Sequence, residues 1–274
     1  MTISGTTRIT GLFGFPVEHT LSPAMHNAAF THLGLDFCYV PFLVHPDSLP
    51  QAVAAVRALN LAGVNVTIPH KEAVIPLLDE VSEEAAFIGA VNTVVNDGGR
   101  LAGHNTDGRG FMKSLEENGC TAAGRKVLVI GAGGASRAVC YYLSDAAESL
   151  TIVDVDIRKQ QQLAADLSRI RRNVHAPAAA ADYGAYDLIV NATPLGMKAE
   201  DPLPLPAEAL RPEQTVCDLI YRTTPLLAAA AARGCRTIDG HGMLLWQGIL
   251  AFELWTRCSA PVEIMRTALR ERIR

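Results

Sequence analysis

The 274-residue chain lacks features that would each point to a different class of protein. It has no apolar run near the roughly 20 residues that cross a bilayer, and its polar N-terminus lacks the apolar core of a signal peptide. A formal net charge of -4, with scattered Lys and Arg, leaves no basic surface for nucleic acid. We therefore expect a soluble, cytoplasmic protein that binds neither nucleic acid nor membranes.

Histidine and cysteine are present, but never at the spacing of a metal site. No H-x-H or H-x-x-x-H pattern occurs, and the six cysteines contain no C-x-x-C pair. The histidines that invite a metal site are His19, His26, His70 and His104, and the cysteines are Cys38, Cys120, Cys140, Cys217, Cys235 and Cys258. We expect these histidines to serve packing or turns, the cysteines to be mostly buried thiols in a reducing compartment, and no metal to be bound.

Hydrophobic residues make up 49% of the chain, enough for one large or two medium cores, and the length favours two domains. In the first half, apolar patterns alternate between strand and helix, as in an α/β layer. Strands are predicted at Arg8–Phe13, Phe37–Val44, Gly63–Ile68, Val91–Val95 and Leu101–Gly103, and helices at Ser22–Leu33, Pro46–Leu59, Lys71–Leu78 and Ser82–Ile88. Ser22 is expected to be the N-cap of the first helix, with Pro23 as its first residue.

The second half has the pattern of a doubly wound parallel sheet. Gly108–Asn118 predicts a linking helix, and Lys126–Ile130 is a continuous apolar run typical of a strand buried on both faces. Thr151–Val155, Leu188–Asn191 and Val216–Ile220 repeat that pattern after helical sequence, and Met243–Leu269 is mostly helical. The predicted fold class is α/β, with an N-terminal α/β substrate domain followed by a Rossmann-like dinucleotide-binding domain.

A glycine-rich turn, Gly131, Ala132, Gly133, Gly134 and Ala135, directly follows the Lys126–Ile130 strand and precedes an apolar helix. In that context glycines let the backbone approach a pyrophosphate, which the helix N-terminus then holds. Ser136 occupies the sixth position of the fingerprint, where Gly or Ala is usual, while Ala138 still permits close packing. The alternative is a tight turn that binds nothing.

An acidic residue, Asp154, ends the next predicted strand. A carboxylate at this place accepts hydrogen bonds from an adenosine ribose and repels a 2′-phosphate, which favours NAD over NADP. Asp156 is an alternative for the exposed acid, and Arg158 or Lys159 would offer a cation to a phosphate. The cofactor is therefore NAD or NADP, with the position of Asp154 favouring NAD.

Polar residues gather at the strand ends of the first half. Asn65 and Thr67 share one face of a strand, and Lys71 follows where α/β folds place their ligands. Asn92 and Asp107 follow in two further polar segments. A Lys with a carboxylate partner can donate and accept a proton beside a carbon that exchanges hydride. Taken singly, each is more commonly a surface or capping residue.

Several segments, in order, resemble motifs of the shikimate dehydrogenase family. They are Gly14–Asn27, Asn65–Lys71 (NVTIPHK), Gly89–Thr93 (GAVNT), Asn105–Gly108 (NTDG), Gly131–Ala138, Asn191–Met197 (NATPLGM) and Asp239–Gly248 (DGHGMLLWQG). The resemblance runs from about Gly14 to Trp255. It implies reversible NAD(P)H-dependent reduction of 3-dehydroshikimate to shikimate, a step of aromatic amino acid (chorismate) biosynthesis. It also implies a catalytic substrate domain over residues 1–107, rejoined by 241–274, and a Rossmann-like domain over residues 108–240.

The resemblance also assigns roles to matching residues. Lys71 and Asp107 correspond to the catalytic pair, with Lys71 as proton donor. Residues implied to bind the ring hydroxyls are Asn65, Thr67, Asn92 and Gln247, and those implied at the substrate carboxylate are Thr20, Ser22 and Tyr221. On the cofactor side the resemblance implies Gly131 to Ala135 at the pyrophosphate, Asn191, Ala192 and Thr193 near the nicotinamide ribose, and Leu219, Gly240 and Met243 against the nicotinamide.

One segment departs from the family pattern. NADP-using members commonly carry Asn-Arg-Thr where this chain has Asp154-Val155-Asp156, and the Arg clamps the 2′-phosphate. NAD-using relatives that also oxidise quinate resemble this pattern more closely. An NAD-preferring quinate/shikimate dehydrogenase is therefore the alternative within the family, and a non-catalytic nucleotide sensor is the alternative outside enzymes. The expected assembly is a monomer or homodimer that binds a small-molecule substrate.

Overall fold

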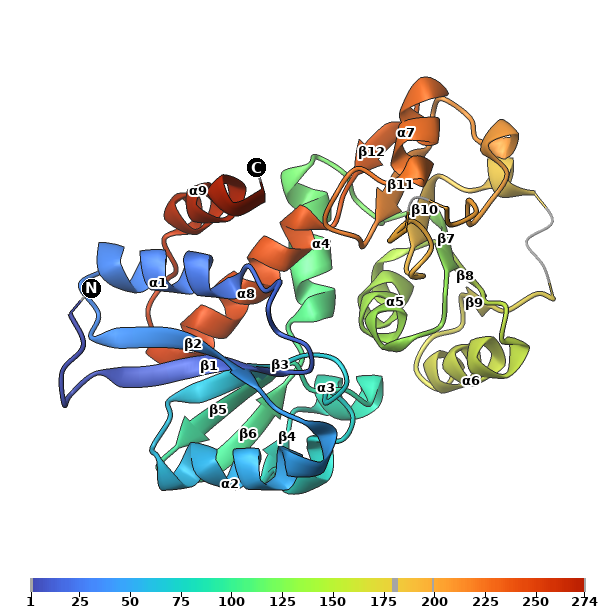
Figure 1. Cartoon of the computed structure of the whole chain (residues 1–274). Helices are drawn as coiled ribbons and strands as arrows, with labels where there is room; N and C mark the ends of the chain where they lie inside the picture. The colour runs from blue at the N-terminus through green and yellow to red at the C-terminus, as the bar shows by residue number, and fades with distance from the viewer. Residues whose placement is uncertain (1, 179–181, 199, 274) are drawn as a thin grey trace. The chain divides into compact units, whose positions relative to one another are not determined.

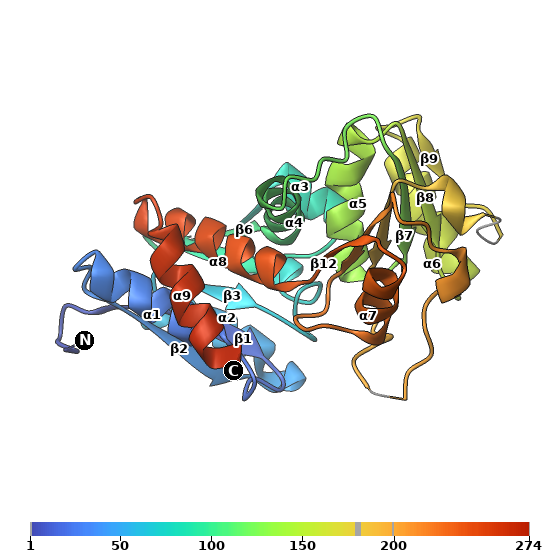
Figure 2. The same ribbon diagram turned by 90° about the horizontal axis from the view of Figure 1, so that it is seen from above.

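The computed structural model describes residues 2–178, 182–198 and 200–273 of the chain, which divides into two compact units. Unit 1 comprises Met1–Thr106 with Gln247–Arg274, and unit 2 comprises Asp107–Trp246. Figures 1 and 2 show the chain from two directions. Among the described residues, no helix combines the length and apolar character needed to cross a membrane.

Unit 1 is built on a six-stranded mixed sheet in the order β2-β1-β3-β5-β6-β4. The strands are β1 (Arg8–Gly14), β2 (Phe37–Leu43), β3 (Gly63–Val66), β4 (Glu80–Val81), β5 (Thr93–Asp97) and β6 (Arg100–His104). β1 pairs in parallel with β2 and β3, whereas β5 runs antiparallel to both β3 and β6. The first part of the chain is therefore an α/β layer.

Helices cover both faces of the unit 1 sheet (Figure 1). They are α1 (Ser22–His32), α2 (Leu49–Ala58), α3 (Glu83–Ile88), the end of α8 (His241–Thr256) and α9 (Val262–Ile273), with short 3-10 turns η1 (Pro46–Ser48) and η2 (Ile75–Leu77). On one face, Leu49, Val53 and Val56 of α2 pack on strand residues such as Val64 and Val94. The apolar spacing on α2 that predicted a helix is thus the spacing that buries one side of it.

Several local predictions in unit 1 are wrong. Leu21, not Ser22, is the N-cap of α1, and Ser22 is its first residue. The predicted Lys71–Leu78 helix is instead a turn followed by η2. Pro76 has no N–H to donate within a helix, and Ile75 donates to the Glu72 carbonyl three residues back, which tightens the segment. The strand predicted at Gly63–Ile68 also ends earlier, at Val66.

Unit 2 is built on a six-stranded parallel sheet. The strands are β7 (Lys126–Ile130), β8 (Ser149–Val153), β9 (Val174–His175), β10 (Leu188–Asn191), β11 (Thr215–Asp218) and β12 (Arg236–Ile238). Numbered within the unit, the order β9-β8-β7-β10-β11-β12 is 3-2-1-4-5-6, the arrangement of doubly wound dinucleotide-binding folds. The strand order reverses between β7 and β10, which is where such folds bind their ligand.

The unit 2 sheet is buried on both faces, as its continuous apolar strands predicted. Leu128 and Ile130 pack with α7 (Pro225–Ala232), whereas Val127 and Val129 alternate to the other face and are fully buried as well. The remaining helices of unit 2 are α4 (Asp107–Glu117), α5 (Gly134–Ala146), α6 (Ile157–Ser168) and the 3-10 turns η3 (Tyr183–Ala185) and η4 (Ala207–Ala209). Figure 2 shows α5, α6 and α7 around this sheet.

Candidate functional site

The glycine-rich turn of unit 2 joins β7 to α5 at the reversal of strand order. Gly131 has φ of 110°, and a Cβ there would lie 2.8 Å from the Ala192 carbonyl oxygen, so this position requires glycine. At Gly133 and Gly134 an added Cβ would meet nothing within 4 Å. The turn therefore has open space above its second and third glycines, at the N-terminus of α5, where backbone N–H groups attract an anion.

Ser136, the departure from the glycine fingerprint, is fully buried and has a structural explanation. Its hydroxyl donates to the Gly131 carbonyl oxygen at 2.6 Å, so the bond joins α5 to the first residue of the turn. The serine therefore replaces a small apolar residue without leaving a buried hydroxyl unpaired. The departure does not disturb the shape of the turn.

Asp154 lies directly after β8 and is bonded to the glycine-rich turn. One carboxylate oxygen accepts the Ala132 N–H at 2.6 Å, and the other accepts the Asp156 N–H at 2.7 Å. Each oxygen keeps a further lone pair, so the carboxylate can still accept a hydrogen bond from a hydroxyl group. Asp156 is the N-cap of α6, accepting the N–H groups of Arg158 and Lys159. Val155, between the two acids, is fully exposed.

A buried polar cluster follows β10, on the other side of the reversal. The Asn191 side chain accepts from the Thr193 N–H and hydroxyl, and donates to the Asp218 carboxylate at 3.0 Å. Asp218 also accepts from the Thr224 hydroxyl at 2.8 Å, and burial raises the pKa of its carboxyl group. The sequence did not predict a role for Asp218. Its signal was an acid at the end of a buried strand, which needs hydrogen-bonding partners.

The remaining predicted cofactor residues of unit 2 lie near the end of β11 and the start of α8. A Cβ on Gly240 would lie 2.3 Å from the Leu219 carbonyl oxygen, so glycine is required where these segments approach each other. Met243 is buried, Leu219 is half-buried and Tyr221 is half-exposed. Gly240 and Leu219 are thus brought together by backbone packing.

Three of the predicted substrate residues lie at the ends of β3 and β5 in unit 1. Asn65 donates to the Asn92 carbonyl and the Thr93 hydroxyl oxygen, both at 3.1 Å. The Asn92 side chain donates to the Thr106 hydroxyl at 2.9 Å and accepts the Thr106 N–H at 2.8 Å. Thr67 follows β3 and is bonded through its N–H to the Phe13 carbonyl. Asn65, Asn92 and Thr93 therefore form one buried network that fixes Thr106, the residue before Asp107.

Two further predicted residues, Thr20 and Ser22, lie at the start of α1 in unit 1. The Ser22 N–H donates to the Thr20 hydroxyl oxygen at 3.3 Å. On β2, the buried Tyr39 phenol donates to the Asn65 side-chain oxygen at 2.9 Å. Sequence reasoning missed Tyr39. Its signal was a tyrosine within an apolar strand, because a buried phenol needs a hydrogen-bonding partner.

The predicted catalytic pair is divided between the two units. Lys71 is half-buried in unit 1, where its carbonyl accepts the Val91 N–H at 2.8 Å. Asp107 is buried at the first position of α4 and belongs to unit 2. Gln247 is half-buried on α8 and belongs to unit 1. Asp107 and Gln247 are therefore helical residues, whereas Asn65, Thr67 and Asn92 lie at strand ends.

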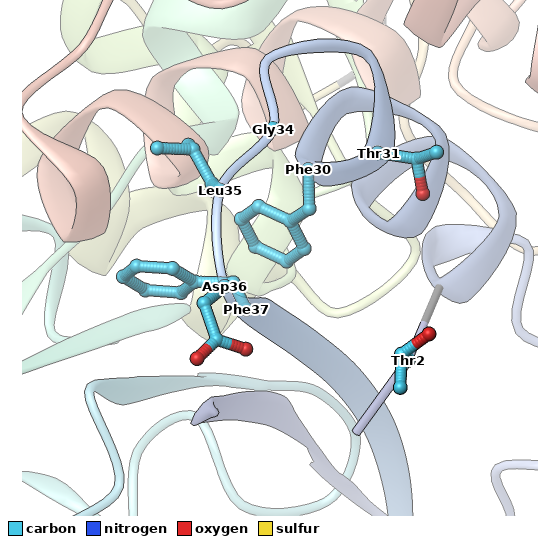
Figure 3. Close-up of a pocket in the computed structure, with 7 residues that line it drawn as sticks. All are labelled: Thr2, Phe30, Thr31, Gly34, Leu35, Asp36 and Phe37. Carbon is cyan, nitrogen blue, oxygen red and sulfur yellow. The ribbon is translucent and has the colours of Figure 1, made fainter. Parts of the chain in front are cut away.

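A surface hollow elsewhere in unit 1 is separate from these residues. It has a volume of about 280 Å³ and is lined by Thr2, Phe30, Thr31, Gly34, Leu35, Asp36 and Phe37 (Figure 3). Asp36, the only charged residue among the seven, already accepts from the hydroxyls of Thr6 and Thr7. In the described ranges of the chain, no group of three or more His, Cys, Asp or Glu side chains is arranged to hold a metal.

Two family models match the chain. The model of the shikimate dehydrogenase substrate binding domain matches residues 12–94, and that of the shikimate 5'-dehydrogenase C-terminal domain matches residues 240–270. A curated relative, the shikimate dehydrogenase (NADP(+)) of Desulforamulus reducens, is 48% identical, and the alignment covers 99% of this chain and 97% of the relative.

Two solved structures have the same fold over nearly the whole chain. Shikimate 5-dehydrogenase from Listeria monocytogenes, in complex with shikimate and NAD, is 38% identical with a TM-score of 0.90, covering 97% of this chain and 98% of its own. Quinate dehydrogenase from Corynebacterium glutamicum, in complex with NAD, is 36% identical with a TM-score of 0.90, covering 97% of this chain and 99% of its own.

Proposed function

This chain belongs to the shikimate dehydrogenase family, and we propose that it catalyses the reversible reduction of 3-dehydroshikimate to shikimate with a nicotinamide cofactor. The observation that carries the proposal is the buried polar network of Asn65, Asn92 and Thr106. Burying amides and hydroxyls costs stability unless they are hydrogen-bonded. In this network the side chains are hydrogen-bonded to one another at strand ends, where α/β folds bind ligands, and Thr106 is followed in the chain by Asp107.

Substrate binding is assigned to unit 1. Thr20 and Ser22, joined by a hydrogen bond at the start of α1, offer hydroxyls to the ring carboxylate. Asn65, Thr67, Asn92 and Gln247 face the ring hydroxyls. Tyr221, from unit 2, is assigned to the carboxylate side.

Proton transfer is assigned to Lys71 and Asp107. In the reduction direction the carbonyl carbon gains a hydride and its oxygen gains a proton, which the Lys71 ammonium donates. Asp107 is assigned to the same step as its carboxylate. In the oxidation direction the neutral Lys71 amine accepts the hydroxyl proton. A bound nicotinamide accepts or supplies the hydride.

Cofactor binding is assigned to unit 2, and we infer a preference for NAD. The open space over Gly133 and Gly134 fits a pyrophosphate, and Asn191, Ala192 and Thr193 follow β10 beside the reversal of strand order. A 2′-phosphate would meet the carboxylates of Asp154 and Asp156. Val155 supplies no guanidinium to offset them, although the curated relative carries NADP(+) in its name.

The direct test is a steady-state assay of the purified protein with shikimate or quinate and with NAD or NADP, following absorbance of the reduced nicotinamide. We expect turnover with shikimate and a higher kcat/KM with NAD than with NADP. A higher kcat/KM with NADP would contradict the cofactor preference alone. A higher kcat/KM with quinate would favour the quinate/shikimate alternative. Cofactor binding without turnover of either acid would favour the non-catalytic sensor.

A further inference from the structure

Tyr39 lies on the edge strand β2, yet its side chain is almost completely buried. It is aligned with Thr10 on β1, and Asn65 on β3 is aligned with Leu12, two residues further along β1. Residues two apart on a strand share a face, so Tyr39 and Asn65 project from the same face of the sheet. The phenol reaches across β1 to a predicted substrate residue.

The phenol is bonded to a predicted substrate-binding residue. Its hydroxyl donates to the Asn65 side-chain oxygen at 2.9 Å. Because the phenol has one proton and this bond uses it, Tyr39 sets the orientation of the Asn65 amide.

The position of Tyr39 is fixed by its neighbours. Its ring stacks on that of His26, with centroids 4.4 Å apart and planes 9° from parallel. Its backbone N–H and carbonyl are both bonded to the Asn27 side chain, which takes the place of a neighbouring strand at this edge. Burial raises the pKa of the Tyr39 phenol, so it stays protonated and remains a donor to Asn65.

We propose that Tyr39 is a positioning residue for substrate recognition, which holds Asn65 in its binding orientation through its hydroxyl. With Tyr39 as donor, the Asn65 oxygen is held as an acceptor, and the amide hydrogens are directed to Asn92 and Thr93. Asn65 therefore meets the ring as a hydrogen-bond acceptor, which selects a hydroxyl that can donate. This inference rests on the proposed function.

The test is Tyr39→Phe, which removes the hydroxyl and keeps the ring that stacks on His26. Tyr186→Phe is the matched control, because Tyr186 lies in unit 2 at the edge of an apolar core. We expect Tyr39→Phe to raise the KM for shikimate about tenfold, because the loss of the bond to Asn65 removes what orients that amide towards the substrate. The kcat and the KM for NAD should stay within about twofold of wild type, and Tyr186→Phe should leave all three unchanged.

A double-mutant cycle separates positioning from a general loss of structure. In an Asn65→Ala background, adding Tyr39→Phe should reduce kcat/KM for shikimate much less than it does in wild type, because its main partner is already absent. An equal reduction in both backgrounds would overturn the proposal. So would an unaltered shikimate KM in Tyr39→Phe, a parallel rise in the NAD KM, or failure of Tyr39→Phe to fold while Tyr186→Phe folds. Absence of shikimate turnover by the wild-type protein would instead refute the proposed function itself.

Discussion

Replacing Asn92 with alanine should lower both stability and activity, because this side chain ties Thr106 into unit 1. The change removes the acceptor of the Thr106 N–H at 2.8 Å and the donor to the Thr106 hydroxyl at 2.9 Å. It also removes the acceptor of the Thr93 hydroxyl at 3.0 Å. All three groups belong to buried residues. Leaving a buried polar group unpaired costs about 1–3 kcal/mol, and the hydroxyls can rotate towards other partners.

We therefore expect the free energy of unfolding to fall by about 3 kcal/mol, mostly through the Thr106 N–H, which cannot rotate. For a chain of this size that loss lowers the unfolding midpoint by about 6 °C. The kcat/KM for shikimate should fall at least about tenfold because Asp107 follows Thr106 directly. Urea and thermal unfolding, with the steady-state assay, measure these effects.

A milder variant grades the effect. Thr106→Val removes one hydroxyl but leaves the backbone N–H bonded to Asn92, so it should cost only about 1 kcal/mol. If Asn92→Ala lost no more stability than Thr106→Val, Asn92 would not be what holds the Thr106 backbone in place, and its role would be limited to contact with the substrate.

Three further results are expected. Burial lowers the pKa of His26 from 6.5 to about 3, so the stability that neutral His26 contributes is complete above pH 6.5 and is lost as pH falls toward 3. About 2 kcal/mol should be gone at pH 5, and urea titrations of His26→Phe should show no such slope. Val155→Arg should raise the ratio of kcat/KM for NADP to that for NAD about tenfold, and an unchanged ratio would argue against a phosphate at this position. Gly133→Ala should leave the unfolding midpoint unchanged but raise the KM for the cofactor, because its Cβ would meet no atom within 4 Å. Gly240→Ala should raise that KM and also destabilise the fold by about 2 kcal/mol, because its Cβ would meet the backbone of Leu219. Equal unfolding midpoints for the two variants would contradict this packing.

The sequence predicted best where one continuous pattern determines the structure. Lys126–Ile130 is a strand with the predicted bounds, because an uninterrupted apolar run bounded by a glycine turn has few alternatives. The strand predicted at Thr151–Val155 is instead Ser149–Val153. The Asp154 N–H bonds to the Gln160 side chain rather than to a neighbouring strand, so pairing stops and Val155 is exposed. The strand propensity of these residues gives no information about the bond between the Asp154 N–H and the Gln160 side chain, so the sequence could not predict where the strand ends.

Residues whose roles depend on distant partners could not be read from the sequence. Tyr39 matters because its phenol donates to the Asn65 side chain, and Asp218 matters because Asn191 and Thr224 donate to it. Both are single polar residues in apolar strands, where burial is predictable and the identity of the partner is not. Ser22 is not the predicted N-cap, because α1 begins one residue earlier than predicted, after Leu21, and no side chain caps its first turn.

The catalytic assignment of Lys71 is tested by shikimate oxidation with the wild-type protein and with Lys71→Ala, side by side with NAD at saturation. We expect turnover by the wild type and a kcat lower by about 100-fold or more in the variant, because a positioned acid or base contributes about that much. The affinity for NAD should be the same in both. Full turnover by Lys71→Ala would contradict the role of Lys71 as proton donor, and a wild type without turnover would contradict the proposed reaction.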